Sequence, residues 1–353
     1  MKNEKLFGLR GGGFVGLHLC ELLIASGIIP LGILDKSEKL IGKEWLGIRI
    51  YSPVDYPSRK HQVIICHSSI VVCNEIKREL EILGYENVDT IYHFAQQETK
   101  AAIFYKQRNI FKVDIAEIVN NEEKINSVMN FLADDMSKRV FVQILSALKN
   151  KTFKIDDTLP LNEQYFPTDI FTLNKNEAVI DIGGGPDGCV LKEFLTRCEE
   201  DYSHYYLIDA CSNINMIETN YNDRRITFIH AAVSDINTFV KVKNYMDKNA
   251  VISDDGEETI KTIIIDNIAW PEKITFMKID VEGYERKVLL GAMKTFSHFR
   301  PIVALAIYHN INDFWELPLF LKSQLTNYSY YLRSYLGIPE TILYAMPNER
   351  LHS

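Results

Sequence analysis

Three ionisable residues follow two apolar segments late in the sequence. Asp280 and Glu282 come at the end of "ITFMKID" and just beyond it, and His309 ends "PIVALAIYH". Ligands of open parallel sheets bind beyond the carboxyl ends of the strands, so these side chains are placed to meet one. A histidine with a pKa near neutrality suits a general base, and a carboxylate can orient a reacting group. We therefore predict catalytic roles for Asp280, Glu282 and His309.

Each of these residues also has a structural interpretation. A charge inside an apolar strand is costly unless it is paired, so Lys278 can form an internal ion pair with Asp181 or Asp280. Glu282 can cap a helix, and the histidine can be a buried structural residue. The three residues and Asp209 could together hold Mg²⁺. No clear ligand spacing is visible, however, and we predict no metal site.

A glycine-rich loop lies upstream of these residues, in "VIDIGGGPDG". Asp181, Gly183, Gly185 and Gly188 give the spacing D-x-G-x-G-x-x-G, in which glycine permits a sharp turn and close approach of a ligand. The helix that follows directs its first amides at that ligand. An acid before the glycines disfavours a pyrophosphate and favours a ligand with an ammonium group, such as S-adenosylmethionine. Asp209, after the next strand, is placed to bind ribose hydroxyls, although a purely structural turn is the alternative.

The stretches "FMKIDVEGYERKVLLGA", "PIVALAIYH", "VIDIGGGPDG", "HAAVSD" and "YYLRSY…ETILYA" resemble the FkbM family of S-adenosylmethionine-dependent methyltransferases. The resemblance covers residues 160–347 and implies a class I fold and methyl transfer to a hydroxyl, often on a sugar. One departure is Asp209, where the family usually has glutamate followed by proline. We predict that the cofactor contacts Tyr165, Asp181, Gly183, Gly184, Gly185, Asp187, Gly188, Asp209, Ala210, Ala232, Val233 and Asp280.

A second glycine-rich loop lies near the start, in "RGGGFVGLHLC". Its G-x-G-x-x-G spacing, with an acid after the next strand, is typical of dinucleotide binding. Residues 1–95 are followed by no second catalytic domain of a dehydrogenase, and such small modules resemble the sugar-nucleotide-binding domains found beside sugar-modifying enzymes. Three interpretations of residues 1–95 remain open: they bind a nucleotide or nucleotide-sugar, they are a purely structural module, or they belong to an NAD enzyme. The predicted nucleotide contacts are Gly11, Gly13, Phe14, Gly16 and Asp35.

The order of the strands and helices that must position these residues predicts an α/β protein with two Rossmann-like domains. In residues 1–95, continuous apolar strands alternate with helices, which indicates a parallel sheet covered on both faces. Residues 96–160 have apolar residues at helical spacing and predict a helical connector. Residues 161–353 predict five parallel strands, a helix and a final antiparallel hairpin, which is the sheet of the class I methyltransferase fold. Arg333, in the hairpin, could face an acceptor.

Composition excludes several classes of function. Apolar residues make up 46% of the 353 residues and charged residues 24%, which is typical of a soluble globular protein. The net charge is −8, and no basic run interleaved with aromatic residues indicates a nucleic-acid partner. We expect no signal peptide and no membrane span. Six cysteines without a C-x-x-C pair indicate reduced thiols in the cytoplasm.

Our leading hypothesis is an S-adenosylmethionine-dependent O-methyltransferase that acts on a sugar, glycan or nucleotide-sugar hydroxyl, in a chain that can form homo-oligomers. One alternative is an NAD-dependent sugar oxidoreductase that uses the first glycine loop. The other is a non-catalytic nucleotide-sugar-binding protein. The acid before the second loop and the terminal hairpin favour the methyltransferase over the oxidoreductase. The sequence does not separate an active methyltransferase from a binding protein with the same fold.

Overall fold

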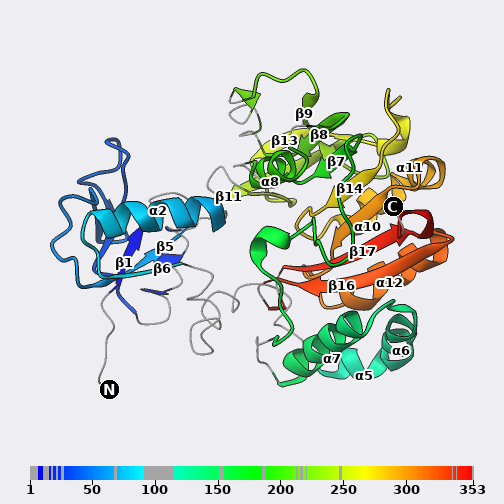
Figure 1. Cartoon of the computed structure of the whole chain (residues 1–353), viewed down its shortest axis with the longest axis horizontal. Coiled ribbons are helices and arrows are strands. Elements are labelled where there is room, and N and C mark those ends of the chain that lie inside the picture. The colour runs from blue at the N-terminus through cyan, green and yellow to red at the C-terminus, as the bar shows by residue number, and fades with distance from the viewer. Residues whose placement is uncertain are drawn as a thin grey trace. The chain divides into compact units, whose positions relative to one another are not determined.

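The computed structural model of the chain divides into two compact units, residues 1–107 and 108–353 (Figure 1). The structure describes residues 7–10, 16, 19–20, 23–24, 28–66, 70–90, 115–150, 155–184, 188–199, 201–211, 214, 218–219, 221–245, 249–335, 337–338 and 340–351.

The first unit holds a six-stranded sheet in the order β3-β4-β2-β1-β5-β6. Its strands pair in parallel, as the sequence predicts, except for the antiparallel hairpin of β3 and β4. Both faces are apolar, with Ile33 and Ile64 buried in one cluster and Leu34 and Val63 in another. The elements are β1 (Phe7–Arg10), β2 (Gly32–Leu34), β3 (Glu44–Trp45), β4 (Ile48–Tyr51), β5 (Gln62–Ile65), α2 (Ile70–Ile82) and β6 (Asn87–Thr90).

The second unit is built on a seven-stranded sheet in the order β16-β17-β15-β14-β7-β8-β9. Five strands run parallel, and β17 pairs antiparallel with both β15 and β16. The predicted strands and the closing hairpin are therefore confirmed. The strands are β7 (Ala178–Ile182), β8 (His204–Asp209), β9 (Ile226–His230), β14 (Phe276–Ile279), β15 (Ile302–Ala306), β16 (Tyr328–Ser334) and β17 (Thr341–Pro347).

A smaller sheet between β9 and β14 is absent from our sequence prediction. Its order is β10-β13-β11-β12, formed by β10 (Ala232–Val233), β11 (Phe239–Tyr245), β12 (Asn249–Ile252) and β13 (Glu258–Ile263). Apolar and charged residues alternate along "VKVK" in β11, which is the period of a half-buried strand. A β-carbon on Gly256 would lie 2.6 Å from the backbone of Val242, so the chain needs glycine where it crosses β11.

The helices of the second unit include three that precede the sheet in sequence. These are α5 (Ile115–Asn120), α6 (Glu122–Phe131) and α7 (Asp135–Asn150), and α7 packs alongside β16 (Figure 1). The backbone amide of Leu332 in β16 donates to the Ser137 hydroxyl of α7 at 2.8 Å. The remaining helices are α8 (Cys189–Arg197), α10 (Glu285–Leu290), α11 (Met293–Phe299) and α12 (Asp313–Gln324).

Arg333 has a structural role in this packing, which corrects the prediction that it could face an acceptor. Its side chain is only 2% exposed and lies 2.6 Å from Asp134 and 2.8 Å from Asp169. Asp134 also accepts from the Ser137 amide and so caps α7. Arg333 therefore ties the start of α7 to β16.

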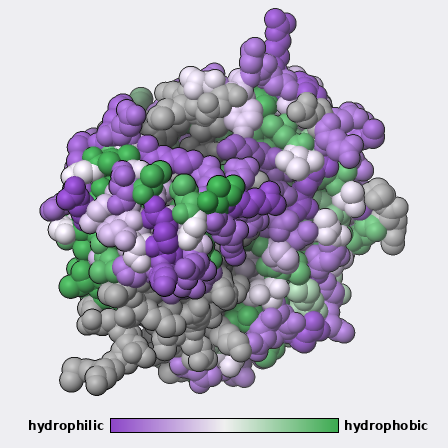
Figure 2. Space-filling model, turned by 60° about the vertical axis from the view of Figure 1, so that its left-hand side comes forward, coloured by the Kyte–Doolittle hydropathy of each residue, from purple (hydrophilic) through white to green (hydrophobic). Residues whose placement is uncertain are grey.

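Within the part of the chain that the structure describes, no helix has the length and apolar character needed to cross a membrane. On the face drawn in Figure 2, hydrophobic residues lie in small groups among hydrophilic ones. All six cysteines are free thiols, and five of them are buried.

Candidate functional site

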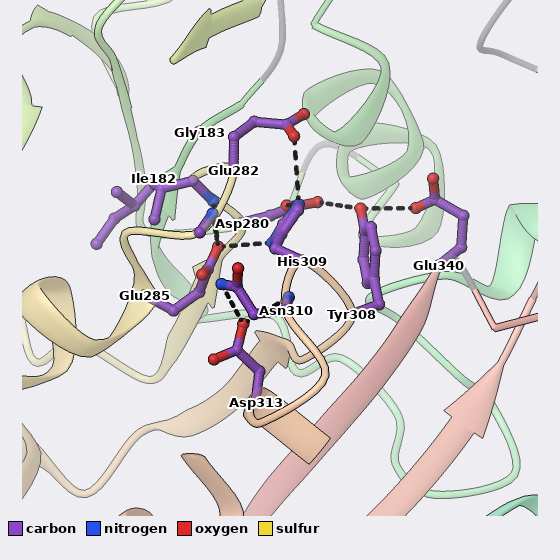
Figure 3. Close-up of polar contacts among 12 residues, drawn as sticks. Ile182, Gly183, Asp280, Glu282, Glu285, Tyr308, His309, Asn310, Asp313 and Glu340 are labelled. Carbon is purple, nitrogen blue, oxygen red and sulfur yellow. Dashed lines mark hydrogen bonds and ion pairs between the residues drawn. The ribbon is translucent and has the colours of Figure 1, made fainter. Parts of the chain in front are cut away.

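The candidate site lies at the carboxyl ends of neighbouring parallel strands in the large sheet. β14 pairs with β7 on one side and with β15 on the other. Asp280 directly follows β14, and His309 follows β15 after Ile307 and Tyr308. Figure 3 shows the side chains from these strand ends pointing toward one another. The sheet thus brings together Asp280, Glu282 and His309, the three residues chosen from the sequence.

The glycines after β7 are required by the packing of the chain itself. Gly183 has a φ of +78°, and a β-carbon there would lie 1.8 Å from the backbone oxygen of Asp280. A β-carbon on Gly184 would lie 2.6 Å from the Leu207 side chain. Gly188 is also left-handed and precedes α8. Gly185 and Asp187 lie outside the described residues, so the predicted ligand contacts there stay predictions.

Asp181 forms a buried ion pair, which was the structural alternative considered for it. Its carboxylate lies 3.1 Å from Lys278 Nζ and accepts from the Tyr205 hydroxyl at 2.7 Å. The side chains of Asp181 and Lys278 are 0% and 2% exposed. Burial opposes the charge of Lys278, but Asp181 and Asp280 outweigh it and raise the pKa of the ammonium. Lys278 also donates to the Gly183 carbonyl, so the pair braces the loop where a donor would bind.

His309 lies among three carboxylates. Its Nδ1 is 2.9 Å from Glu285, and its Nε2 is 3.4 Å from Asp280 and 3.5 Å from Glu282. The ring is 6% exposed, and burial alone would lower its pKa. Glu285, Glu282 and Asp280 outweigh burial and raise the pKa of His309 to about 10. The imidazole therefore carries a proton at neutral pH, which is the wrong state for the general base that we predicted.

Glu285, the first residue of α10, fixes the loop that precedes the helix, and Glu282 does not cap it. Its Oε1 accepts from the backbone amides of Val281 at 2.9 Å and Gly283 at 3.3 Å, and its side chain is 1% exposed. Glu282 has a φ of +54° and is 31% exposed, the most accessible of the carboxylates around His309. This left-handed backbone turns the Glu282 side chain toward the imidazole, as Figure 3 shows.

Two tyrosines hold the other side of the Asp280 carboxylate. Oδ2 accepts from the Tyr165 hydroxyl at 2.5 Å and from the Tyr308 hydroxyl at 3.3 Å. The Tyr308 hydroxyl is also 3.1 Å from Glu340, which accepts from Gln164 at 2.8 Å. Burial, and then the charge of Asp280, raise the pKa of Tyr165 well above its usual value, so Tyr165 remains a hydrogen-bond donor.

The other predicted cofactor contacts lie near the ends of β8 and β9. Asp209 ends β8, and its Oδ1 accepts from the Cys211 amide at 2.7 Å, which fixes the turn. Ala210, half-buried, follows Asp209. Ala232 and Val233 form β10 and are 5% and 4% exposed, so their side chains pack inside the protein.

In the first unit, the structure describes only part of the predicted nucleotide site. Asp35 directly follows β2, which neighbours β1, and its Oδ1 accepts from the Ser37 amide at 2.7 Å. Gly16 is helical and buried. Gly11, Gly13 and Phe14 lie outside the described residues, and nucleotide binding there remains a prediction.

The sequence reasoning missed Glu285, Tyr308 and Glu340. Glu285 stands in the first turn of a helix, where an acidic residue is favourable, and Tyr308 immediately precedes His309. The sequence positions of Glu285 and Tyr308 could therefore have indicated that both lie near the site. Glu340 carried no such signal, because only the hairpin geometry brings it beside Tyr308.

The raised pKa of Asp313, which lies below His309 in Figure 3, leads us to expect that the stability of the protein depends on pH. Burial and the nearby Glu285 raise its pKa from 3.8 to about 6, although Asn310 and the positive His309 oppose this. The folded protein therefore favours the protonated form of Asp313. This preference adds to the free energy of unfolding in full below pH 3.8, and the added stability is lost as the pH rises through about 6. Asp313→Asn should therefore gain stability relative to wild type as the pH rises through this window, as measured by urea unfolding. Equal gain in Glu316→Gln, an exposed carboxylate on the same helix, would contradict this origin.

Comparison with known proteins identifies a domain in this part of the chain. Residues 193–332 match the family model described as Methyltransferase FkbM domain. The crystal structure of methyltransferase FkbM from Methylobacillus flagellatus KT is 20% identical, with a TM-score of 0.57 over 97% of this chain and 90% of that chain. A SAM-dependent methyltransferase from Aquifex aeolicus is 14% identical, with a TM-score of 0.31 over 61% of this chain and 100% of that chain. No curated protein matches the sequence. Residues 193–332 thus match an FkbM methyltransferase domain, and the fold of the chain is similar to that of the Methylobacillus protein.

Proposed function

We propose that this chain transfers a methyl group from S-adenosylmethionine to a hydroxyl oxygen, and that the acceptor is a sugar or nucleotide-sugar. The observation that carries the proposal is the group of ionisable side chains, Asp280, Glu282 and His309, at the carboxyl ends of β14 and β15. Open α/β sheets bind their ligands at these strand ends. The group lies within the segment that matches the methyltransferase domain.

The residues around the site fit a positively charged donor. Asp280, Glu282 and Glu285 face a single imidazolium, which leaves an excess of negative charge. S-adenosylmethionine supplies a methyl group on a positively charged sulfur and also carries an ammonium group. We assign Asp209, at the end of β8, to the ribose hydroxyls, because an acid in this position binds ribose in related nucleotide folds.

Methyl transfer to an alcohol needs an acceptor held in line and a group that takes its proton. A lone pair of the hydroxyl oxygen forms the new bond to carbon, the carbon–sulfur bond breaks, and its electron pair stays on sulfur. We assign the proton to Asp280, because the raised pKa of His309 leaves the imidazole already protonated and unable to accept another proton. Tyr165 and Tyr308 hold Asp280 in place through one oxygen. Glu282, the more exposed carboxylate, is suited to bind a second hydroxyl of the acceptor.

The test is a transfer assay with S-adenosylmethionine labelled in its methyl group and a panel of sugars and nucleotide-sugars. We expect label on an acceptor oxygen and one S-adenosylhomocysteine released for each methyl transferred. Donor binding without transfer to any hydroxyl acceptor in the panel would instead favour a binding protein that retains the fold.

Asp209 provides a separate prediction about the donor. Asp209→Asn keeps an oxygen for the Cys211 amide but removes the negative charge that would bind ribose hydroxyls. A hydrogen bond to a charged group is worth about 1.5–3 kcal/mol, so affinity for S-adenosylhomocysteine should fall by about 10-fold or more in calorimetry. The control is Asp255→Asn, in the turn between β12 and β13. Unchanged affinity in Asp209→Asn would remove Asp209 from the donor site.

A further inference from the structure

We infer that His309, Asp280 and Glu282 form a binding site for a divalent transition-metal cation, with Glu285 orienting the imidazole. Among the described residues, donor atoms of Asp280, Glu285 and His309 all lie within 4.8 Å of one another. This grouping differs from the magnesium alternative raised from the sequence, because Glu285 enters it and Asp209 does not. The cation site also gives the imidazole a function, whereas the proposed methyl transfer assigns none to it.

The first observation is that the imidazole lacks hydrogen bonds. Both ring nitrogens of His309 are buried, and neither makes a hydrogen bond of acceptable geometry with the residues that the structure describes. A buried polar group without a hydrogen bond costs about 1–3 kcal/mol. The ring nevertheless points into a group of carboxylates, as Figure 3 shows. A bound cation would satisfy a ring nitrogen that the protein alone leaves without a hydrogen bond.

The second observation is the spacing of the donor atoms. Two donors bound at about 2.1 Å to one cation, at angles of about 90–110°, lie roughly 3.0–3.4 Å apart. Nε2 of His309 is 3.4 Å from Asp280 Oδ1 and 3.5 Å from Glu282 Oε2. Each of these oxygens is therefore at ligand spacing from Nε2, and the more exposed Glu282 side chain would turn toward Asp280 when both bind one cation.

The third observation distinguishes the two nitrogens of the ring. Nδ1 lies 2.9 Å from Glu285, whose Oε1 is fixed by two backbone amides. Metal-binding histidines usually direct their second nitrogen at a carboxylate, which fixes the ring and raises its basicity. Glu285 occupies that place and is a positioning residue, while the cation would replace the proton on Nε2, which is released to solvent when the metal binds. Asp280 and Glu282 are 15% and 31% exposed, so the cation would keep open positions on the accessible side.

The donor set indicates the class of metal. Imidazole suits zinc, iron, nickel and copper, whereas carboxylates suit magnesium, calcium and manganese. One nitrogen with two carboxylate oxygens favours a first-row divalent ion such as Mn²⁺ or Fe²⁺ over Mg²⁺. If the proposed methyl transfer also holds, such an ion would bind the acceptor hydroxyl and make its proton easier to remove.

The test is the binding of Mn²⁺ to the full chain after treatment with EDTA, followed by electron paramagnetic resonance and calorimetry. We expect one tightly bound ion and a nitrogen coupling in the pulsed spectrum, which reports the histidine directly. His309→Gln should abolish the nitrogen coupling and weaken binding by about 10-fold or more. Glu285→Gln should weaken binding by about 10–100-fold and keep the coupling, because Nε2 remains available. Asp255→Asn is the control and should bind Mn²⁺ as wild type does.

No Mn²⁺ binding by the wild-type chain, or binding without nitrogen coupling, would overturn the proposal. Unchanged affinity in His309→Gln would overturn it as well. Circular dichroism and S-adenosylhomocysteine binding establish that each variant is folded. The readout needs no turnover, so the cation site and the methyl transfer can fail independently. Zn²⁺ and Mg²⁺ are titrated under the same conditions, and we expect the chain to bind Mg²⁺ more weakly than Mn²⁺.

Discussion

Replacing Asp280 with asparagine should lower the turnover number for methyl transfer by about 10²–10⁴-fold, the range contributed by a positioned base. Asparagine has nearly the same shape, so it can still accept from the Tyr165 and Tyr308 hydroxyls. It lacks the charge that takes a proton or holds a cation. The measurement is the steady-state rate with the best acceptor found in the labelled-methyl assay.

The same Asp280→Asn variant should bind S-adenosylhomocysteine within about threefold of wild type, because we assign Asp280 to the acceptor proton in place of the cofactor contact predicted from the sequence. Asp255→Asn, matched in chemistry but outside the site, should leave both quantities unchanged. A loss of turnover below about tenfold would give Asp280 a structural role. A large loss of donor affinity would move Asp280 to the donor side of the site.

Replacing Lys278 with methionine should lower the free energy of unfolding of the second unit by about 3–5 kcal/mol, the usual cost of leaving a buried charge without its partner. Asp181 is fully buried, and its remaining hydrogen bond, from Tyr205, does not neutralise a carboxylate. Urea unfolding followed by tryptophan fluorescence, with Trp45 of the first unit replaced by phenylalanine in all variants, reports the second unit through Trp270 and Trp315.

A double variant separates the missing charge from the missing side-chain volume. Lys278→Met with Asp181→Asn removes both charges and keeps a group that can bond to Tyr205, so most of the lost stability should return. Arg139→Met is the matched control, because Arg139 pairs with Asp157 at the surface and should contribute only about 0–1 kcal/mol. A double variant as unstable as Lys278→Met would show that packing of the lysine stem dominates.

Much of the large sheet could be predicted because its central strands are distinct apolar runs. β7, β14 and β15 are buried along their whole length, which gives a parallel strand its continuous apolar pattern. The short "GIPE" connection required β16 and β17 to be antiparallel. The small sheet was missed because its strands are partly exposed, and Phe239 is 70% exposed.

The candidate site was predicted only where the sequence order already implied proximity. Asp280 and His309 follow adjacent parallel strands, so their meeting follows from topology alone. Tyr165 and Glu340 approach the site from segments at either end of the unit. Their contacts depend on how the chain before β7 and the hairpin fold back. The protonation state of His309 depends on Glu285, whose distance from the ring no spacing in the sequence reveals.

The central claim is that the glycine loop of the second unit serves a methyl donor. The most direct measurement is calorimetry of the full chain with S-adenosylhomocysteine and with NAD in separate titrations. We expect one S-adenosylhomocysteine bound per chain, with affinity reduced in Asp209→Asn, and no tight binding of NAD. Tight NAD binding with no response to S-adenosylhomocysteine would contradict the account and favour the oxidoreductase alternative.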